Sequence, residues 1–314
     1  MKIGIDILGG DYAPASVLDG IFLALNELPE QVNLVAIGPE NEINSYFSEK
    51  NIDSKRIEIV HASETIGMGE HPARAFTNKP NSTIAKGYSL LKSGSIQAFA
   101  GAGNTGAMMV GAVLSVKPVE GVQRPCILSL LPKVTGGYGI LLDVGSNVDC
   151  KPDLLFQFAL LGSIYAQHVL KINNPKIGLL NIGEEPEKGN QLAQQTHILL
   201  KESNELNFIG NIEGRDFWNS KADVIVADGF TGNVALKLAE SFYAVYRKSG
   251  LSDPYMDRFN YENYGGTPIL GINKTVVVGH GISNAIAIKN MILLAHQVEL
   301  AGLTSKFTKA FQPT

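Results

Sequence analysis

The stretch that decides the fold is IQAFAGAGNTGAMMVGAVLS, residues 96–115. Its first five residues predict a buried strand, its glycine-rich middle predicts a tight turn, and Thr105–Ser115 predicts a helix. The run Ile96–Val116 is also the nearest approach to a membrane span in the chain. Glycine, asparagine and threonine near its middle would leave polar groups in lipid, so we interpret it as a strand, a turn and a helix.

The same alternation of strand and helix patterns runs along nearly the whole chain. Such alternation is typical of an α/β fold, in which helices cover both faces of a doubly wound, mostly parallel sheet and make three layers. The strands Cys126–Leu131 and Gly139–Val144, separated by a glycine turn, are predicted to be antiparallel. No change of composition marks a linker, so residues 1–314 are expected to form a single domain with two intimately joined lobes. The other predicted strands are Lys2–Ile7, Val32–Gly38, Ile57–Val60, Lys176–Asn181, Asn207–Ile212, Asp223–Ala227 and Thr275–Val278, and the other predicted helices begin at Pro14, Ser82, Pro152, Lys188, Thr231 and Ser283.

The composition excludes several classes of protein. The chain has 314 residues, of which 45% are hydrophobic and 18% charged, so a disordered chain is excluded. The formal net charge of −4 argues against a protein whose main partner is nucleic acid. Two cysteines cannot make a disulfide framework, and the first residues carry no secretion signal, so a cytoplasmic location is expected.

Glycine-rich turns follow four of the predicted strands. In open α/β sheets ligands bind at the carboxyl ends of the strands, where helix N-termini attract phosphate. Tight strand–helix turns also need glycine for purely structural reasons, but polar residues in all four turns favour a phosphate site. The turns are Gly9–Asp11, Gly101–Gly106, Gly229–Asn233 and Gly279–Ser283.

Other chemistries fit the sequence less well. The turn Gly101–Gly106 matches the glycine fingerprint of dinucleotide sites, but the acidic residue expected about 20 residues later is only Glu120, in a predicted loop. The histidines have no metal-ligand spacing, so no metal site is expected. Cys150 lies beside Asp149, whose charge would raise the pKa of the thiol, so a catalytic thiolate is not expected.

A series of distinctive motifs runs along the chain: GGDYAP (9–14), AGNTGA (102–107), RP (124–125), LDVGSNVDC (142–150), NIGEE (181–185), GNIEGRD (210–216), DGFTGNVALK (228–237), YGGTP (264–268) and HG (280–281). In this order they resemble the motifs of the PlsX family, the bacterial acyl-ACP:phosphate acyltransferases. The resemblance implies a fold like those of phosphotransacetylase and isocitrate dehydrogenase, and a homodimer without a cofactor. The implied reaction makes acyl phosphate from acyl-acyl carrier protein and inorganic phosphate for phospholipid synthesis. The implied user of the product is a membrane glycerol-3-phosphate acyltransferase.

Such a reaction needs a cradle for phosphate and hydrogen-bond donors for the oxyanion of the attacked thioester. Lys188 and the turns around Asn104 and Asn233 are the best candidates for these tasks, and His280 is the candidate proton carrier. As alternatives, Lys188 only begins a surface helix, the two asparagines only cap helices, and His280 makes a structural hydrogen bond. The other residues expected to bind substrate or phosphate are Asp6, Gly10, Asp11, Lys79, Gly103, Thr105, Gly106, Asp143, Asn147, Asp149, Asp228 and Gly232.

The chain departs from the family pattern in two places. The stretch Ala75–Thr83 lacks the arginine that family members usually carry, and Lys79 is the cation that remains there. The connection Ser249–Glu262 is shorter than the helical hairpin that family members use for membrane contact. Its tip is the candidate for weak peripheral membrane contact, with the residues Leu251, Tyr255, Met256, Phe259, Arg247, Lys248 and Arg258.

Three classes of function follow from the sequence. The favoured one is acyl transfer to phosphate. A nicotinamide-dependent dehydrogenase on the related fold is the second, and the missing strand-end acid argues against it. The third is a non-catalytic scaffold at the membrane that delivers acyl groups, which would not need the polar residues of the glycine turns.

Overall fold

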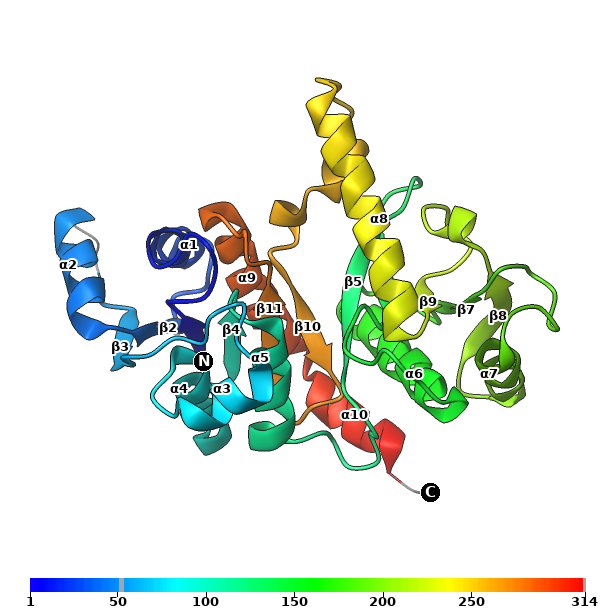
Figure 1. Ribbon diagram of the computed structural model, residues 1–314, viewed down its shortest axis with the longest axis horizontal. Helices are drawn as coiled ribbons and strands as arrows, with labels where there is room; N and C mark the ends of the chain where they lie inside the picture. The colour runs from blue at the N-terminus through cyan, green and yellow to red at the C-terminus, as the bar shows by residue number, and fades with distance from the viewer. Residues whose placement is uncertain (51–53, 313–314) are drawn as a thin grey trace. The chain divides into compact units, whose positions relative to one another are not determined.

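The computed structural model describes residues 1–50 and 54–312. Contacts divide the chain into two compact units, which we call unit 1 (Met1–Pro118 with Tyr261–Gly302) and unit 2 (Val119–Asn260 with Leu303–Thr314). Each unit is therefore built from two separate stretches of sequence (Figure 1). The single domain with two joined lobes stays a prediction.

The sheet of unit 1 has the strand order β3-β2-β1-β4-β11-β10, and every pair is parallel except β10 with β11. Its central strand β1 is buried between its neighbours from Ile3 to Asp6, and Ile3 and Ile5 contribute its aliphatic core side chains. The helices α1 and α9 pack against each other, and α4 packs on β1, β2 and β4. The strands are β1 (Lys2–Asp6), β2 (Asn33–Gly38), β3 (Ile57–His61), β4 (Ala98–Gly101), β10 (Gly266–Leu270) and β11 (Thr275–Gly279), and the helices are α1 (Ala15–Leu25), α2 (Glu40–Lys50), α3 (Pro72–Asn78), α4 (Thr83–Ser93), α5 (Thr105–Gly111) and α9 (Ala285–Ala301), with a π-helical turn at Ala112–Val116 and a short 3-10 helix at Tyr261–Asn263.

The sheet of unit 2 has the strand order β5-β6-β9-β7-β8, and only β5 with β6 is antiparallel. The helix α6 packs on β6, β9 and β7 and also contacts α7 and α10, whereas α8 contacts β6. The strands are β5 (Cys126–Pro132), β6 (Tyr138–Leu142), β7 (Lys176–Leu180), β8 (Asn207–Ile212) and β9 (Val224–Val226), and the helices are α6 (Pro152–His168), α7 (Gln191–Glu202), α8 (Gly229–Lys248) and α10 (Leu303–Phe311), with short 3-10 helices at Gly214–Asp216 and Met256–Phe259.

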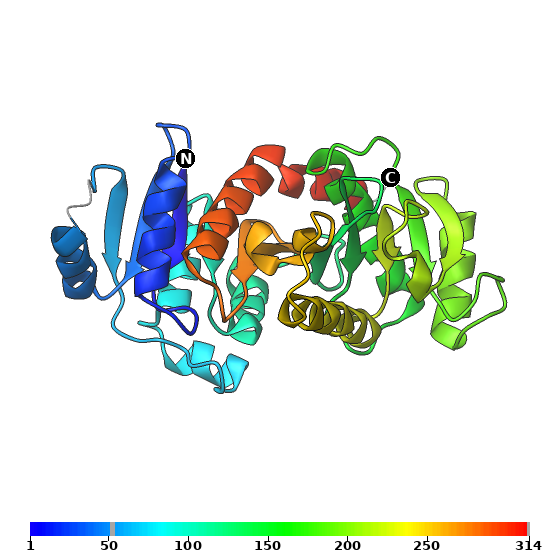
Figure 2. The same cartoon turned by 90° about the horizontal axis from the view of Figure 1, so that it is seen from above.

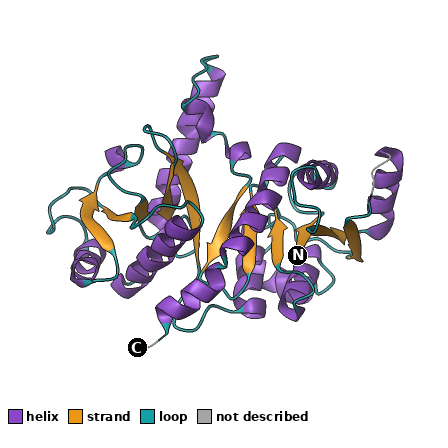
Figure 3. Cartoon of the chain, turned by 180° about the vertical axis from the view of Figure 1, so that it is seen from behind, coloured by secondary structure: helices purple, strands orange, loops and turns teal. Residues whose placement is uncertain are grey.

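The predicted fold class is confirmed. Helices flank the strands of each unit on both faces, as expected for three layers (Figures 2 and 3). The antiparallel pairing of the two strands around the Gly136–Gly137 turn is also confirmed. Within the described residues no single helix is both long and apolar enough to cross a bilayer, and only α9 and α10 taken together reach that length and hydropathy.

Several element boundaries differ from the predictions. The helix predicted from Thr105 to Ser115 ends as an α-helix at Gly111 and continues as the π-helical turn. The helix predicted from Thr231 begins two residues earlier, because Asp228 accepts a hydrogen bond from the Thr231 N–H and caps it. The helix predicted from Lys188 begins at Gln191, so Lys188 lies in the loop before it.

Candidate functional site

The carboxyl end of β1 in unit 1 carries a buried carboxylate, Asp6, which is 1% exposed. Its Oδ1 accepts a hydrogen bond from the Leu8 N–H at 3.1 Å. Gly9 lies so close that a Cβ there would be 2.5 Å from Asp6 Oδ2. Burial raises the pKa of Asp6 to about 6, because the charged form loses its hydration. Asp6 is therefore the anchor around which the first glycine turn is folded.

The glycine turns of unit 1 meet one another at this edge of the sheet. The Asp11 N–H donates to the Gly281 carbonyl at 2.7 Å, which joins the turn after β1 to the turn after β11. Gly10 contacts the same carbonyl. The half-buried His280 lies beside Tyr261, with ring centroids 5.3 Å apart. The structure thus brings Gly10, Asp11 and His280 together, as a shared site requires.

Asn104 clamps a neighbouring loop. Its Oδ1 accepts from the Ala107 N–H at 2.9 Å, so Asn104 caps α5. Its Nδ2 lies 3.0 Å, 3.3 Å and 3.2 Å from the carbonyl oxygens of Gly67, Met68 and Glu70. The donors of this buried amide are therefore engaged within the protein.

Lys79 is held by the same loop. Its Nζ lies 2.6 Å from Glu70 Oε1 and 3.0 Å from the Thr65 carbonyl. The hydrogen bond from Lys79, with a second from the Gly67 N–H, keeps the pKa of Glu70 below its usual range. The cation that the sequence places in the phosphate site is paired with a carboxylate in this structure.

The dinucleotide-like glycines have structural contacts of their own. Gly101 and Gly103 pack on Asp6, and Gly106 packs on Pro72 in the first turn of α3. Thr105, the first residue of α5, is exposed. Close packing inside the protein thus accounts for the G-x-G-x-x-G spacing.

A second buried carboxylate, Asp143, lies directly after β6 in unit 2 and has no exposed surface. Its Oδ1 accepts from the Ile127 N–H at 3.0 Å and from the Ser146 hydroxyl at 2.6 Å. Its Oδ2 accepts from the Asn147 N–H at 2.6 Å and from Asn147 Nδ2 at 3.1 Å. Burial raises the pKa of Asp143, and these hydrogen bonds oppose the rise.

The first turn of α8 packs on this carboxylate. A Cβ at Gly232 would overlap the carbonyl oxygen of Asp143, so the helix can approach the strand end only through glycine. Asn233 Nδ2 donates to the Val144 carbonyl at 3.1 Å. Asn233 therefore lies at the start of the second turn of α8 and holds the loop after β6, and the interpretation of this residue as a helix cap is wrong. The cap is Asp228.

The loop that follows Asp143 also carries the exposed Asp149 and the half-buried Cys150. Burial raises the pKa of the Cys150 thiol to about 11, so it is protonated at neutral pH. Cys126 is buried in β5, and burial raises the pKa of its thiol as well. Among the residues described here, no group of three or more His, Cys, Asp or Glu side chains is arranged to hold a metal ion.

Lys188 lies in the loop Ile182–Gly189, between β7 and α7 of unit 2. The side chain is exposed, and its Nζ has no ion-pair or hydrogen-bond partner within residues 1–50 and 54–312. The loop itself is fixed. Asn181 Nδ2 donates to the Lys188 carbonyl at 3.1 Å, and Gln194 Nε2 donates to the Glu187 carbonyl at 2.7 Å.

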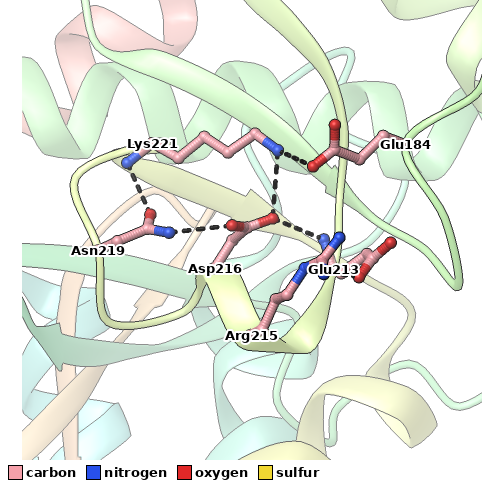
Figure 4. Close-up of polar contacts among 6 residues, drawn as sticks. All are labelled: Glu184, Glu213, Arg215, Asp216, Asn219 and Lys221. Atoms are coloured by element: carbon pink, nitrogen blue, oxygen red, sulfur yellow. Dashed lines mark hydrogen bonds and ion pairs between the residues drawn. The ribbon is translucent and has the colours of Figure 1, made fainter.

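Charged residues that the sequence analysis did not single out fix the other side of this loop. Lys221 Nζ lies 2.6 Å from Glu184 Oε1 and 3.2 Å from Asp216 Oδ2 (Figure 4). Asn219 Nδ2 also donates to Asp216 at 2.9 Å. Glu184 and Asp216 lie in the motifs NIGEE and GNIEGRD, but no motif includes Lys221, which bridges to Glu184 across 37 positions.

The predicted site residues thus form two groups. In unit 1 the structure gathers Asp6, Gly10, Asp11, Gly103, Asn104, Thr105, Gly106, Lys79 and His280 around three turns. In unit 2 the residues at the N-terminus of α8 are Asp143, Asn147, Asp228, Gly232 and Asn233. The exposed Asp149 follows in the loop after β6, and Lys188 lies on the loop after β7.

Known proteins of similar fold share this architecture. A phosphotransacetylase from Staphylococcus aureus superposes with a TM-score of 0.66 at 16% identity, covering 95% of this chain and 94% of the other. A 4-hydroxythreonine-4-phosphate dehydrogenase from Klebsiella pneumoniae superposes with a TM-score of 0.58 at 12% identity, covering 95% and 98%. At such low identity these likenesses concern the fold alone.

Sequence comparison is more specific. The family model described as "Fatty acid synthesis protein" matches residues 1–248. The "Phosphate acyltransferase" of Dictyoglomus thermophilum is 44% identical over 317 residues, covering 95% of this chain and 94% of that protein. The "Phosphate acyltransferase" of Salinibacter ruber is 38% identical over 331 residues, covering 99% and 98%. The chain therefore belongs to the family of phosphate acyltransferases, as the motifs in its sequence predict.

Proposed function

We propose that this acyltransferase moves an acyl group from the thioester of acyl carrier protein to inorganic phosphate. The observation that carries the proposal is the 44% identity to a phosphate acyltransferase over nearly the full length of both chains. The buried strand-end carboxylates and the glycine turns add support, since they build the kind of helix N-termini that bind anions.

The chemistry is a single displacement at a carbonyl carbon. An oxygen of hydrogen phosphate attacks the thioester carbon, a C–O bond forms, and the C–S bond breaks. The phosphate proton ends on the departing thiolate, so the products are acyl phosphate and the free thiol of the carrier. The protein has to orient the phosphate and stabilise the oxyanion of the tetrahedral intermediate.

The contacts suggest a division of roles among the candidate residues. Lys188 supplies a positive charge without an internal partner, so we assign it to phosphate or to the oxyanion. Asn104 and Asn233 act as positioning residues, because their amides already hold loops. His280 is assigned to proton transfer. The remaining predicted residues of the turns contribute backbone contacts.

The homodimer belongs to the same proposal and is supported by α8. Five large apolar side chains, between 54% and 66% exposed, follow one face of this helix at spacings of three or four residues. They are Phe230, Val234, Leu238, Phe242 and Val245. Leu238→Glu should shift the sedimentation coefficient from dimer to monomer, and a wild-type chain that sediments as a monomer would refute the dimer.

The proposed location is the cytoplasm, with weak contact at the membrane where a glycerol-3-phosphate acyltransferase takes up the lipid-like product. Two residues of the tip predicted to contact the membrane pack within the protein instead. Tyr255 and Phe259 lie as neighbouring rings, and Phe259 also contacts Trp218. Leu251, which is exposed, and the basic end of α8 remain. Leu251→Ser should abolish flotation with anionic liposomes, and unchanged flotation would place the contact elsewhere.

The proposed activity is tested directly. Purified protein is mixed with acyl-acyl carrier protein and inorganic phosphate, and acyl phosphate is trapped with hydroxylamine as the hydroxamate. Hydroxamate that appears only with both substrates supports the proposal. Hydroxamate no greater than in a phosphate-free control refutes it.

A further inference from the structure

Unit 2 contains a cavity of about 450 Å³ at the carboxyl ends of β7 and β9. Its wall is mainly aliphatic and comes from α6, β7, α7 and the residue after β9. The aliphatic residues are Leu155, Leu179, Leu180, Ile182, Leu192, Ala193 and Ala227. A volume of this size lies within the range of small-molecule sites, which is about 300–1,000 Å³.

The polar residues at the edge of the cavity already have partners. Asn190 Oδ1 accepts from the Ala193 N–H at 2.9 Å, and both carboxylate oxygens of Asp228 accept from Thr231. Asn181 Nδ2 donates to the Lys188 carbonyl. Because these groups are satisfied, the cavity offers an occupant mostly apolar contact.

The loop Ile182–Gly189 forms one edge of the cavity and is held in place by a hydrogen bond from β8. Asn211 Nδ2 donates to the Glu185 carbonyl at 2.8 Å. The Asn211 Oδ1 is in turn 2.9 Å from His197 Nδ1, which donates to it. The Lys221 bridge to Glu184 fixes the outer part of the loop (Figure 4). The cavity is therefore a preformed pocket, and the loop whose ends, Ile182 and Gly189, line it also carries the exposed Lys188.

We propose that this pocket receives the acyl chain of the thioester donor. The inference rests on the proposed function, since it identifies where that donor binds. An alkyl chain is the part of the donor that gains from aliphatic walls and needs no hydrogen bonds. Each methylene moved from water into such a wall improves binding by about fourfold. With the chain in the pocket, the polar thioester lies at the edge, next to the loop Ile182–Gly189.

Substitutions on α7 distinguish an effect inside the pocket from an effect elsewhere on the same helix. Leu192→Trp fills the pocket, and Ile198→Trp adds the same side chain on the same helix at a position that is 54% exposed and outside the pocket. Leu192→Ala enlarges it. The measurement is KM for hexanoyl- and palmitoyl-acyl carrier protein in the hydroxamate assay.

The expected result for Leu192→Trp is an increase of about tenfold in the ratio of the palmitoyl KM to the hexanoyl KM, because the longer chain loses between one and two buried methylenes at about fourfold each. Leu192→Ala should lower that ratio, and Ile198→Trp should leave it unchanged. A ratio that stays constant in both Leu192 variants overturns the proposal, whatever their overall activity. Absence of hydroxamate with the wild type and every donor would instead refute the proposed function.

Binding of the fluorescent fatty acid cis-parinaric acid gives a second readout that needs no turnover. The wild type and Ile198→Trp should enhance its fluorescence equally, and Leu192→Trp should weaken its binding by about tenfold. Equal binding by all three proteins, each folded by circular dichroism, overturns the proposal.

Discussion

The main-chain N–H of Asn147 donates to Oδ2 of Asp143 at 2.6 Å, so a carboxylate without solvent contact holds the loop that follows its own strand. Asp6 does the same in unit 1, where it accepts from the Leu8 N–H. Each unit thus folds a glycine turn around a buried aspartate at a strand end. The conformation of these turns therefore depends on close packing as well as on the buried carboxylates.

Gly232→Ala should destabilise the protein by about 3 kcal/mol or more, because the new Cβ meets a backbone carbonyl that cannot move aside. Gly214→Ala is the matched control. No heavy atom lies within 4 Å of a Cβ at that position, so its effect should stay within about 0.5 kcal/mol. Urea unfolding measures both, and equal midpoints for the two variants would contradict the packing argument.

Asp6→Asn should change how stability depends on pH. Burial raises the folded-state pKa of Asp6 from 3.8 to about 6, so the wild type gains a stabilising contribution from the protonated form below about pH 4 and loses it as the pH rises through 6. Asparagine does not ionise. The free energy of unfolding of the variant relative to the wild type should therefore rise by about 2.4 kcal/mol between pH 4 and pH 7. If the difference in the free energy of unfolding stays constant over this range, ionisation of Asp6 does not destabilise the folded protein.

Asn104→Ala should lower stability by about 2–3 kcal/mol, since it removes a helix cap and leaves three loop carbonyls with a lost donor. Asn190→Ala removes a cap of the same geometry without such a clamp and should cost about 1 kcal/mol. Thermal unfolding of the two variants gives the comparison. If Asn190→Ala is the more damaging, the loop is not held by Asn104.

Lys188→Ala should reduce kcat/KM for phosphate by about 10²-fold, the usual cost of removing one stabilising group from a developing charge. Its stability should not change, because the Nζ has no partner among the described residues. Lys201→Ala, an exposed lysine at the end of α7, is the control and should keep wild-type kinetics. Steady-state rates at limiting phosphate decide the matter, and full activity in Lys188→Ala would remove this residue from the site.

The sequence predicts the alternation of strands and helices well, because apolar periodicity and glycine turns are local signals. It misses α2, where only Ile43 and Phe47 are buried on an otherwise polar helix. It also starts α7 too early. Gly189 has a φ of 91°, which an α-helix does not contain, and the true cap is Asn190, one residue later.

The site is predicted less completely, since its decisive contacts are not local. The glycine turns and strand-end aspartates can be read from short motifs. The clamp of Asn104 on Gly67–Glu70 and the bond from Asn211 to Glu185 join residues about 25 to 40 positions apart, and no period records them. The aliphatic pocket likewise takes its wall from four different elements.

The discontinuity of unit 1 has a consequence for synthesis on the ribosome. In the finished sheet β4 lies between β1 and β11, and β11 is separated from β4 by more than half of the chain. Until β11 has emerged, the nascent polypeptide presents one edge of β4 unpaired, while nearly all of unit 2 has already been made. Unit 2 can therefore complete its sheet first, and unit 1 depends on a late, long-range strand insertion that favours slow folding and recruitment of chaperones.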